Sequence, residues 1–221
     1  MSKLRLVVLI SGGGSNLQAI IDAVESGSLN AEIGLVLSNK PEAGGLERAK
    51  KHGIATAVLD HKSFASRDAF DRELADQIQA ASPDLVILAG FMRILTPDFV
   101  AGFEGRLLNI HPSLLPKYPG LNTHQRAIDA GDEVHGVTVH FVTAELDGGP
   151  PILQSGVIIE QSDTAETLAA KVLKQEHVIY PLVIHWFGEG RLHLAKGEAF
   201  FDNEALPSTG MSYNQSEMLL D

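Results

Sequence analysis

The first half of the sequence alternates short apolar runs with amphipathic segments, and this alternation is the strongest constraint on its fold. Residues 6–10 form a continuous apolar run, which is typical of a strand buried on both faces of a sheet. Residues 16–25 follow with apolar side chains on one helical face. Further strands are expected at 33–37, 54–59 and 85–88, and further helices at 46–52 and 67–80. Repeated strand–helix–strand units predict an α/β fold with a mostly parallel, twisted sheet and helices on both faces.

The second half runs from a buried strand into a proline-rich loop and then into longer elements. The strand is expected at 107–110, and the loop 111–119 follows it directly. The remaining expected elements are a helix at 125–130, strands at 134–142 and 152–159, a helix at 164–186 capped by Thr164, and a strand pair at 192–194 and 199–201. We therefore expect antiparallel strands in the C-terminal half, one domain over 1–206, and a flexible tail over 207–221.

Composition and charge exclude several classes of partner. With 221 residues, 44% of them apolar, the chain is long enough for one sizeable core. The net charge of −11 disfavours nucleic acid and anionic membranes, although a local pocket can still bind one phosphate. The absence of cysteine excludes disulfides, thiolate metal sites and a cysteine nucleophile. No stretch is long enough to span a membrane or resembles a signal peptide, so we expect a cytoplasmic protein.

A glycine-rich segment at 11–16, Ser-Gly-Gly-Gly-Ser-Asn, follows the first strand and opens a helix. Glycines let backbone N–H groups approach an anion closely, and a helix N-terminus favours negative charge. Leu17 stands where the dinucleotide fingerprint has its third glycine, and no Gly-Lys-Ser/Thr follows, so neither a nicotinamide dehydrogenase nor a P-loop is favoured. Two interpretations stay open: a site for a phosphate monoester, and a flexible turn without a ligand.

Asn109 and His111 stand at the end of the strand that precedes the proline-rich loop. Side chains alternate along a strand, so these two residues point to the same side. An amide that holds a developing oxyanion and an imidazole that exchanges a proton near neutral pH suit an acyl-transfer reaction. A purely structural role for the pair is the alternative, and the prolines that hold the following loop rigid favour the functional one.

Asp147 precedes two glycines, a position where aspartate is usually a turn residue. If the fold brings Asp147 beside His111, the carboxylate would favour the protonated imidazole. His135 and His140 are five apart in an expected strand and therefore face opposite sides, and the other histidines are scattered. We therefore predict no metal site.

Five separated segments carry a resemblance to a known family: 10–17, 89–95, 109–116, 146–149 and 175–177. In this order they resemble the glycinamide ribonucleotide formyltransferases, folate-dependent enzymes of purine synthesis. The resemblance implies a Rossmann-like formyltransferase fold, with phosphate and substrate binding in the N-terminal half and folate binding and catalysis in the C-terminal half. It also implies direct formyl transfer from 10-formyltetrahydrofolate, a co-substrate, to the glycinamide amine through a tetrahedral intermediate, without a metal.

The resemblance also implies residue roles. Asn109 would bind the oxyanion, His111 would donate a proton or stabilise charge, and Asp147 would orient His111. The implied substrate contacts are Gly14, Ser15, Asn16, Lys174, Gln175 and Glu176, of which Glu176 would receive the cationic amine. The implied folate contacts are Arg67, Met92, Arg93, Ile94, Leu95, Asn109, Thr143, Ala144, Glu145, Leu146 and Asp147. Without the resemblance, Glu176 and Arg67 would be interpreted as solvated helix residues.

One departure and several alternatives accompany this interpretation. Gly13 stands where some close relatives carry Asn; the change is tolerable if backbone amides hold the phosphate, whereas the loss of a side-chain contact would weaken substrate binding. A methionyl-tRNA formyltransferase would carry a further, more basic C-terminal domain, and a formyltetrahydrofolate deformylase a regulatory N-terminal one. A non-catalytic folate- or phosphate-binding protein would not need Asn109, His111 and Asp147 together.

We therefore expect small-molecule partners and a monomer or weak homodimer. The proline-rich turn also allows a cis Leu115–Pro116 bond.

Overall fold

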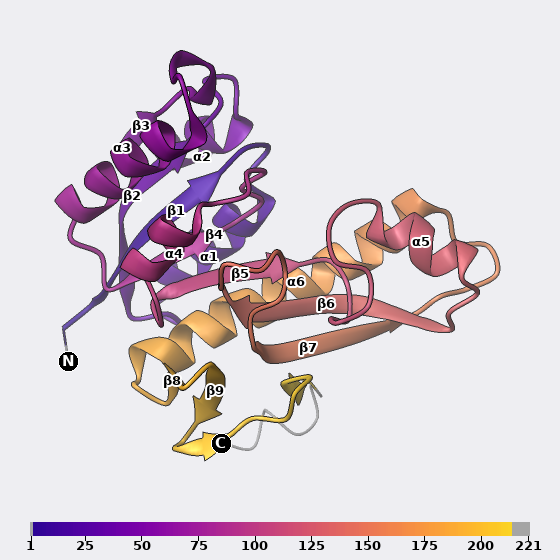
Figure 1. Ribbon diagram of the computed structural model, residues 1–221. Helices are drawn as coiled ribbons and strands as arrows, with labels where there is room; N and C mark the ends of the chain where they lie inside the picture. Colours follow the sequence, from indigo (N-terminus) through magenta and orange to yellow (C-terminus); the bar gives the residue numbers. More distant parts are fainter. Residues whose placement is uncertain (1, 214–221) are drawn as a thin grey trace. The chain divides into compact units, whose positions relative to one another are not determined.

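The computed structural model describes residues 2–213 of the chain, which form two compact units. The first unit comprises the residues up to Asn109 together with Val142–Ala144. The second comprises Ile110–Phe141 and the residues from Glu145 onward. Each unit is built around hydrogen-bonded strands and helices, which Figure 1 labels.

The first unit contains a parallel sheet with the strand order β5-β4-β1-β2-β3. In register, Leu6 of β1 pairs with Leu85 of β4, and Leu4 of β1 pairs with Ala31 of β2. The chain builds outward from β1 to β3, and then returns to add β4 and β5 on the other side of β1. Ligands of open α/β sheets bind where the strand order reverses in this way. The strands are β1 Leu4–Ile10, β2 Ala31–Ser38, β3 Thr56–Val58, β4 Leu85–Leu88 and the beginning of β5 Leu107–His111.

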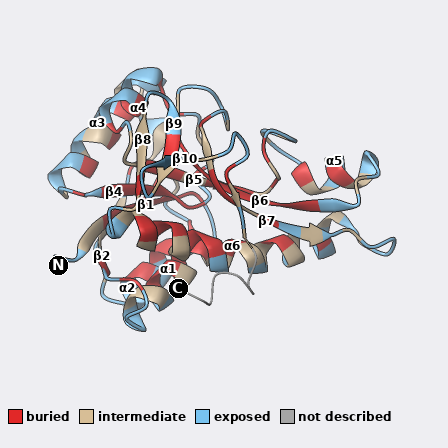
Figure 2. Ribbon diagram, turned by 90° about the horizontal axis from the view of Figure 1, so that it is seen from below, coloured by how far each residue is buried: buried red, intermediate tan, exposed pale blue. Residues whose placement is uncertain are grey.

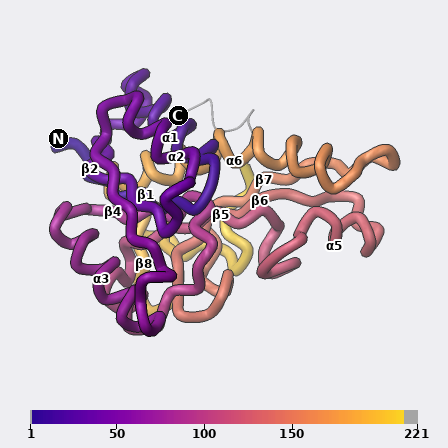
Figure 3. Tube along the Cα trace, turned by 90° about the horizontal axis from the view of Figure 1, so that it is seen from above, coloured from indigo at the N-terminus to yellow at the C-terminus, as the bar shows by residue number. Residues whose placement is uncertain are grey.

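Helices cover both faces of this sheet. Figures 2 and 3 show α1 and α2 on one face and α3 on the opposite face. The apolar core beside the strands includes Val7, Phe70 and Phe103, which are fully buried. The helical elements are α1 Ser15–Glu25, α2 Gly44–Lys51, the short 3₁₀ helix His61–Ser63, α3 Arg67–Ala80 and α4 Pro97–Gly102.

The second unit pairs its two long strands in antiparallel fashion. Strand β6, Val134–Phe141, pairs with β7, Pro151–Ile158, and the long helix α6, Ala165–Gly188, packs along both (Figure 1). Helix α5, Thr123–Asp129, also contacts α6. A separate antiparallel sheet follows α6 and consists of β8 Leu192–Ala195, β9 Glu198–Phe201 and β10 Glu204–Ala205.

The predicted α/β class is confirmed, including the parallel sheet, its covering helices and the antiparallel strands of the C-terminal half. Thr164 caps α6 as predicted, because its hydroxyl accepts the N–H of Thr167 at 3.3 Å. Helix α4 was not predicted: it has six residues, too few for a periodic signal, and depends on Thr96 as its cap. The strand expected at 54–59 is limited to Thr56–Val58.

Part of the segment expected as a flexible tail is ordered. Met211 and Ser212 form β11, which pairs in parallel with Leu153 and Gln154 of β7. Pairing of this kind uses backbone groups only, so it left no apolar pattern to detect. Residues 214–221 of the expected tail lie outside the described residues. Across residues 2–213, no helix is both long and apolar enough to cross a membrane.

Gly136 supplies a test of the packing in the second unit. It lies in β6, and a Cβ atom there would overlap the Ser155 carbonyl oxygen and lie 2.8 Å from Leu114 Cδ2. We expect Gly136→Ala to lower the free energy of unfolding by about 2 kcal/mol, since overpacking typically costs ~1–3 kcal/mol. Gly156→Ala is the matched control, because its Cβ would lie 3.2 Å from Val134 Cγ1 and at an ordinary 3.8 Å from the His135 carbonyl oxygen. Equal stability of the two variants in urea titrations would contradict this account.

Candidate active site

The glycine segment forms a tight turn between β1 and α1. Gly14, the N-cap residue of α1, has φ 73°, a left-handed conformation that L side chains rarely adopt. A Cβ atom on Gly14 would also lie 2.7 Å from the Cα of Gly45 in α2. Gly14 offers no side chain to cap the first turn of α1, so that turn keeps the anion-binding character of a helix N-terminus. Ser15 and Asn16 begin α1.

The segment after β4 is connected to the glycine turn by Ser11. The Ser11 hydroxyl accepts the N–H of Met92 at 2.8 Å and donates to Asn39 Oδ1 at 2.5 Å. The two loops that flank the reversal of strand order are thus connected, and sequence reasoning did not single out Ser11. The Met92 N–H is already hydrogen-bonded to Ser11. A ligand ring that lies against residues 92–95 would therefore have to form its hydrogen bonds with the backbone groups of the residues beside Met92.

The other residues expected to contact folate in the first unit differ in exposure. Met92 and Ile94 are exposed, at 61% and 53%, whereas Leu95 is buried. The Arg93 guanidinium lies 4.5 Å from the centre of the Phe70 ring. Arg67, exposed, is the first residue of α3. Thr143 and Ala144 also belong to this unit.

His111 contacts two acceptors in the second unit. Its Nε2 lies 2.9 Å from the carbonyl oxygen of Tyr118, and its Nδ1 lies 3.5 Å from Oδ2 of Asp147. A carbonyl only accepts, so Nε2 carries the hydrogen of the first contact. The side chains of His111 and Asp147 are each only 7% exposed. The condition set by the sequence, that the fold bring Asp147 beside His111, is therefore met.

Asp147 is held by its own backbone and by a neighbouring loop. It has φ 51°, a conformation uncommon for a non-glycine residue, and its Oδ2 accepts the Gly120 N–H at 2.8 Å. Glu145 and Leu146, which precede it, are exposed. The carboxylate is thus directed toward His111 by a hydrogen bond that does not use the imidazole.

His140 approaches the same carboxylate, and sequence reasoning missed it. Its Nε2 lies 4.0 Å from Asp147 Oδ1, and its Nδ1 lies 2.8 Å from the Phe141 carbonyl oxygen. Burial lowers the pKa of His140 to about 4, against the smaller opposing effects of the Phe141 hydrogen bond and Asp147. His140 is therefore neutral at pH 7 and does not compete with His111 as a cation.

Side chains from the surrounding elements fix the backbone of the proline-rich loop. Thr138 Oγ1 donates to the Ser113 carbonyl at 2.7 Å and accepts the Leu115 N–H at 3.0 Å. The Tyr118 hydroxyl donates to Asp132 at 2.8 Å. The Leu115–Pro116 bond is cis. These bonds hold the Tyr118 carbonyl that His111 contacts.

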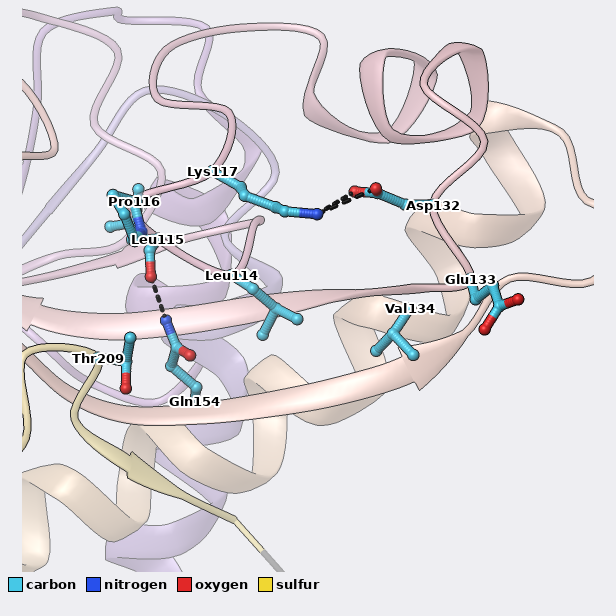
Figure 4. Close-up of a pocket in the computed structure, with 9 residues that line it drawn as sticks. All are labelled: Leu114, Leu115, Pro116, Lys117, Asp132, Glu133, Val134, Gln154 and Thr209. Carbon is cyan, nitrogen blue, oxygen red and sulfur yellow. Dashed lines mark hydrogen bonds and ion pairs between the residues drawn. The ribbon is translucent and has the colours of Figure 1, made fainter.

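A hollow of about 390 Å³ lies beside this loop (Figure 4). The Gln154 side chain donates to the Leu115 carbonyl at 2.7 Å, and Lys117 pairs with Asp132 at 3.0 Å. None of the predicted catalytic or binding residues lines this hollow. It is lined by Leu114, Leu115, Pro116, Lys117, Asp132, Glu133, Val134, Gln154 and Thr209.

Helix α6 carries three residues that the resemblance assigns to the substrate. Glu176 is only 9% exposed, so its interpretation as a solvated helix residue is wrong. Gln175 Oε1 accepts the hydroxyl of Ser155, a buried residue of β7, at 2.8 Å. Lys174 is exposed on the same helix.

The chain supplies an amide from Asn109, an imidazole from His111 and a carboxylate from Asp147. Asn109 precedes His111 by two positions in β5, so their side chains project from the same face of that strand. Within residues 2–213, no group of three or more His, Asp or Glu side chains is arranged to hold a metal ion. The chemistry that these residues can supply is oxyanion binding and proton exchange.

The parallel α/β sheet with its glycine turn in the first unit, and the buried His–Asp pair in the second, are features of an α/β protein whose class the comparisons with known proteins establish. Residues 4–184 match the formyl transferase family, to which the chain belongs. It is 55% identical over 212 residues to the phosphoribosylglycinamide formyltransferase of Escherichia coli K12, covering 96% of this chain and 100% of that protein. The corresponding protein of Haemophilus influenzae is 53% identical, covering 93% and 97%.

Solved structures agree with the family assignment. The phosphoribosylglycinamide formyltransferase of Coxiella burnetii is 48% identical and superposes with a TM-score of 0.93, over 96% of this chain and 100% of that chain. A further sequence relative is the human trifunctional purine biosynthetic protein adenosine-3, which is 44% identical over 88% of this chain and 19% of that protein. The resemblance stated from the five sequence segments is confirmed.

The buried His140 makes stability depend on pH. Its pKa is about 4 in the folded chain, below the ordinary 6.5, so the unfolded state binds more protons between these values. The contribution of neutral His140 is complete above pH 6.5 and is lost as the pH falls toward 4. We expect His140→Asn to reduce the pH slope of the free energy of unfolding between pH 6 and 5 by up to about 1.4 kcal/mol per pH unit. Chemical unfolding at both pH values checks this, and an unchanged slope contradicts it.

Proposed function

We propose that this enzyme transfers the formyl group of 10-formyltetrahydrofolate to the amine of N1-(5-phospho-D-ribosyl)glycinamide in de novo purine (IMP) biosynthesis. The products are the N2-formyl compound and tetrahydrofolate. The observation that carries the proposal is the contact between His111 and Asp147 at 3.5 Å. His111 follows Asn109 by two positions, and the chain is 55% identical to a phosphoribosylglycinamide formyltransferase. The folate is a co-substrate, and the proposed reaction requires no metal.

The proposed reaction proceeds through a tetrahedral intermediate. The neutral amine attacks the formyl carbon, the carbonyl oxygen becomes an oxyanion, and the bond from that carbon to the folate nitrogen N10 breaks. The amine loses one proton and N10 gains one. Asn109 donates to the oxyanion, and protonated His111 stabilises it and supplies a proton.

The contacts of His111 must change for it to supply this proton. Its Nε2–H is donated to the Tyr118 carbonyl and its Nδ1 faces the Asp147 carboxylate, so the proposed transfer requires Nε2 to leave the Tyr118 carbonyl for the substrate. Asp147 is proposed to orient the ring through its contact with Nδ1 at 3.5 Å. The buried Glu176 on α6 is proposed to bind the cationic amine before it is deprotonated.

The proposed binding residues divide between the two substrates. Gly14, Ser15 and Asn16 bind the phosphate and ribose, and Lys174, Gln175 and Glu176 complete the substrate contacts. Arg67 binds the glutamate carboxylate of the folate. The ring system of the folate contacts residues 92–95 and 143–147. The predicted cytoplasmic location and monomeric or weakly dimeric state stay predictions.

An assay with both substrates tests the proposal. The purified protein is mixed with 10-formyltetrahydrofolate, with and without the glycinamide ribonucleotide, and the deformylated folate is followed by absorbance. Product only with both substrates supports the transferase. Product from the folate alone indicates a hydrolase, and binding without product indicates a non-catalytic protein, either of which contradicts the proposal.

Removal of either proposed donor to the transition state should lower turnover strongly. We expect Asn109→Ala and His111→Ala each to reduce kcat by roughly a hundredfold or more, because one lost oxyanion donor costs about 2.7–4 kcal/mol in the barrier. His193→Ala, which removes a histidine that stacks on Phe200 in the small sheet, serves as the control. Normal kcat in either Asn109→Ala or His111→Ala would overturn the assigned role.

Asp147→Asn separates the charge of this residue from its shape. The amide oxygen of asparagine can still accept the Gly120 N–H, so the loop and the stability of the fold should be retained. We expect a lower kcat, because the negative charge 3.5 Å from the His111 ring is lost. A wild-type kcat in this variant would show that the charge of Asp147 does not act in the reaction.

A further inference from the structure

Arg48 of helix α2 reaches the backbone of the glycine turn. Its Nε donates to the Gly13 carbonyl oxygen at 2.7 Å, and its Nη1 lies 3.4 Å from Gln18 Oε1 of α1. Within the described part of the chain, no carboxylate lies within 4 Å of this guanidinium. A cation without an acidic partner is therefore fixed beside the turn.

A second bond from α2 holds the preceding peptide of the turn. The Gly45 N–H donates to the Gly12 carbonyl oxygen at 3.0 Å. The close approach of the two backbones requires glycine, because a Cβ on Gly45 would lie 2.5 Å from Ile10 Cδ1 and 3.2 Å from the Cα of Gly14. Two successive carbonyls of the turn, those of Gly12 and Gly13, are thus anchored to α2.

Anchoring these carbonyls determines where the next N–H groups point. In a trans peptide the C=O and the following N–H point in opposite directions. The N–H groups of Gly13 and Gly14 therefore face away from α2, and among residues 2–213 neither has a hydrogen-bond acceptor. Two N–H groups held in this way, next to the N-terminus of α1, form a preorganised anion cradle.

We propose that Arg48 is a positioning residue for the substrate phosphate: it holds the Gly13 carbonyl so that the Gly13 and Gly14 N–H groups are preset to bind a phosphate monoester. This inference rests on the proposed function, since it assigns the phosphate of that substrate to the glycine turn. Binding by N–H groups needs no side chain at position 13, where the backbone has an ordinary φ and a Cβ would meet nothing within 4 Å.

The first test measures binding of ribose 5-phosphate by calorimetry, without catalysis. We expect Arg48→Met to weaken binding roughly tenfold, the order expected for a hydrogen bond to a charged group. Lys51→Met is the matched control, because it removes one cation from the same helix and no contact to the turn, and it should stay within about twofold of wild type. Equal weakening in both variants, or in neither, would overturn the positioning role.

A second variant separates charge from geometry. Arg48→Lys keeps the positive charge but loses the planar donor fork that reaches Gly13 and Gln18 together, so we expect it to remain weakened. Wild-type affinity in Arg48→Lys would show that charge alone suffices and would overturn the proposal. Thermal unfolding of each variant establishes that it is folded.

Kinetics with two substrates then place the effect at the phosphate. For Arg48→Met we expect KM for the glycinamide ribonucleotide to rise roughly tenfold with kcat little changed, and no change in kcat/KM for the unphosphorylated glycinamide riboside. An equal loss with both substrates would overturn the proposal. Failure of the wild-type transfer assay, with ribose 5-phosphate binding still dependent on Arg48, would overturn only the proposed reaction. Failure of wild type to bind ribose 5-phosphate would overturn the positioning role as well.

Discussion

The orientation of the His111 ring depends on its hydrogen bond to the Tyr118 carbonyl. That bond has a fixed direction only because the loop 112–120 has a fixed backbone. Thr138 binds the loop near its beginning, Gln154 binds the Leu115 carbonyl, and Asp132 receives the Tyr118 hydroxyl. The loop in turn gives the Gly120 N–H to Asp147. The imidazole and its carboxylate are therefore oriented by one segment, so a change at either end of the loop moves both.

In the first unit, the position of the glycine turn after β1 is fixed by close backbone contacts that side chains would prevent. Gly14 and Gly45 bring the turn after β1 against α2 at a distance that a Cβ would prevent. A turn held in this way loses little further freedom when an anion binds, which is the advantage of a preorganised site. The reversal of strand order beside β1 places the segment after β4 next to the same turn, where Ser11 connects the two. The reversal of strand order beside β1 thus brings the loop after β1 and the loop after β4 side by side.

The sequence predicted the elements with strong periodicity and the residues whose types carry chemistry. Arg67–Ala80 and Leu85–Leu88 have the predicted bounds, because an amphipathic stripe and a short buried run are each unambiguous at those lengths. Asn109 and His111 were proposed from residue type and spacing, and Asp147 on the condition that it lies beside His111, which the fold meets; their roles stay predictions. The supporting contacts could not be found in this way. Ser11, His140 and Ser155 are polar residues within or beside apolar strands, and their partners are fixed only by the folded chain.

The protonation of His140 decides how the charge of Asp147 is shared. Two imidazoles approach one carboxylate, at 3.5 Å and 4.0 Å. Burial holds the pKa of His140 at about 4, and its Nδ1–H is used by the Phe141 carbonyl, so its Nε2 carries no hydrogen at pH 7. A second cation at this position would compete with His111 for the carboxylate and would repel it. Because His140 is buried as a neutral neighbour, it adds no second positive charge beside Asp147 at pH 7, and the carboxylate faces His111 without that competition.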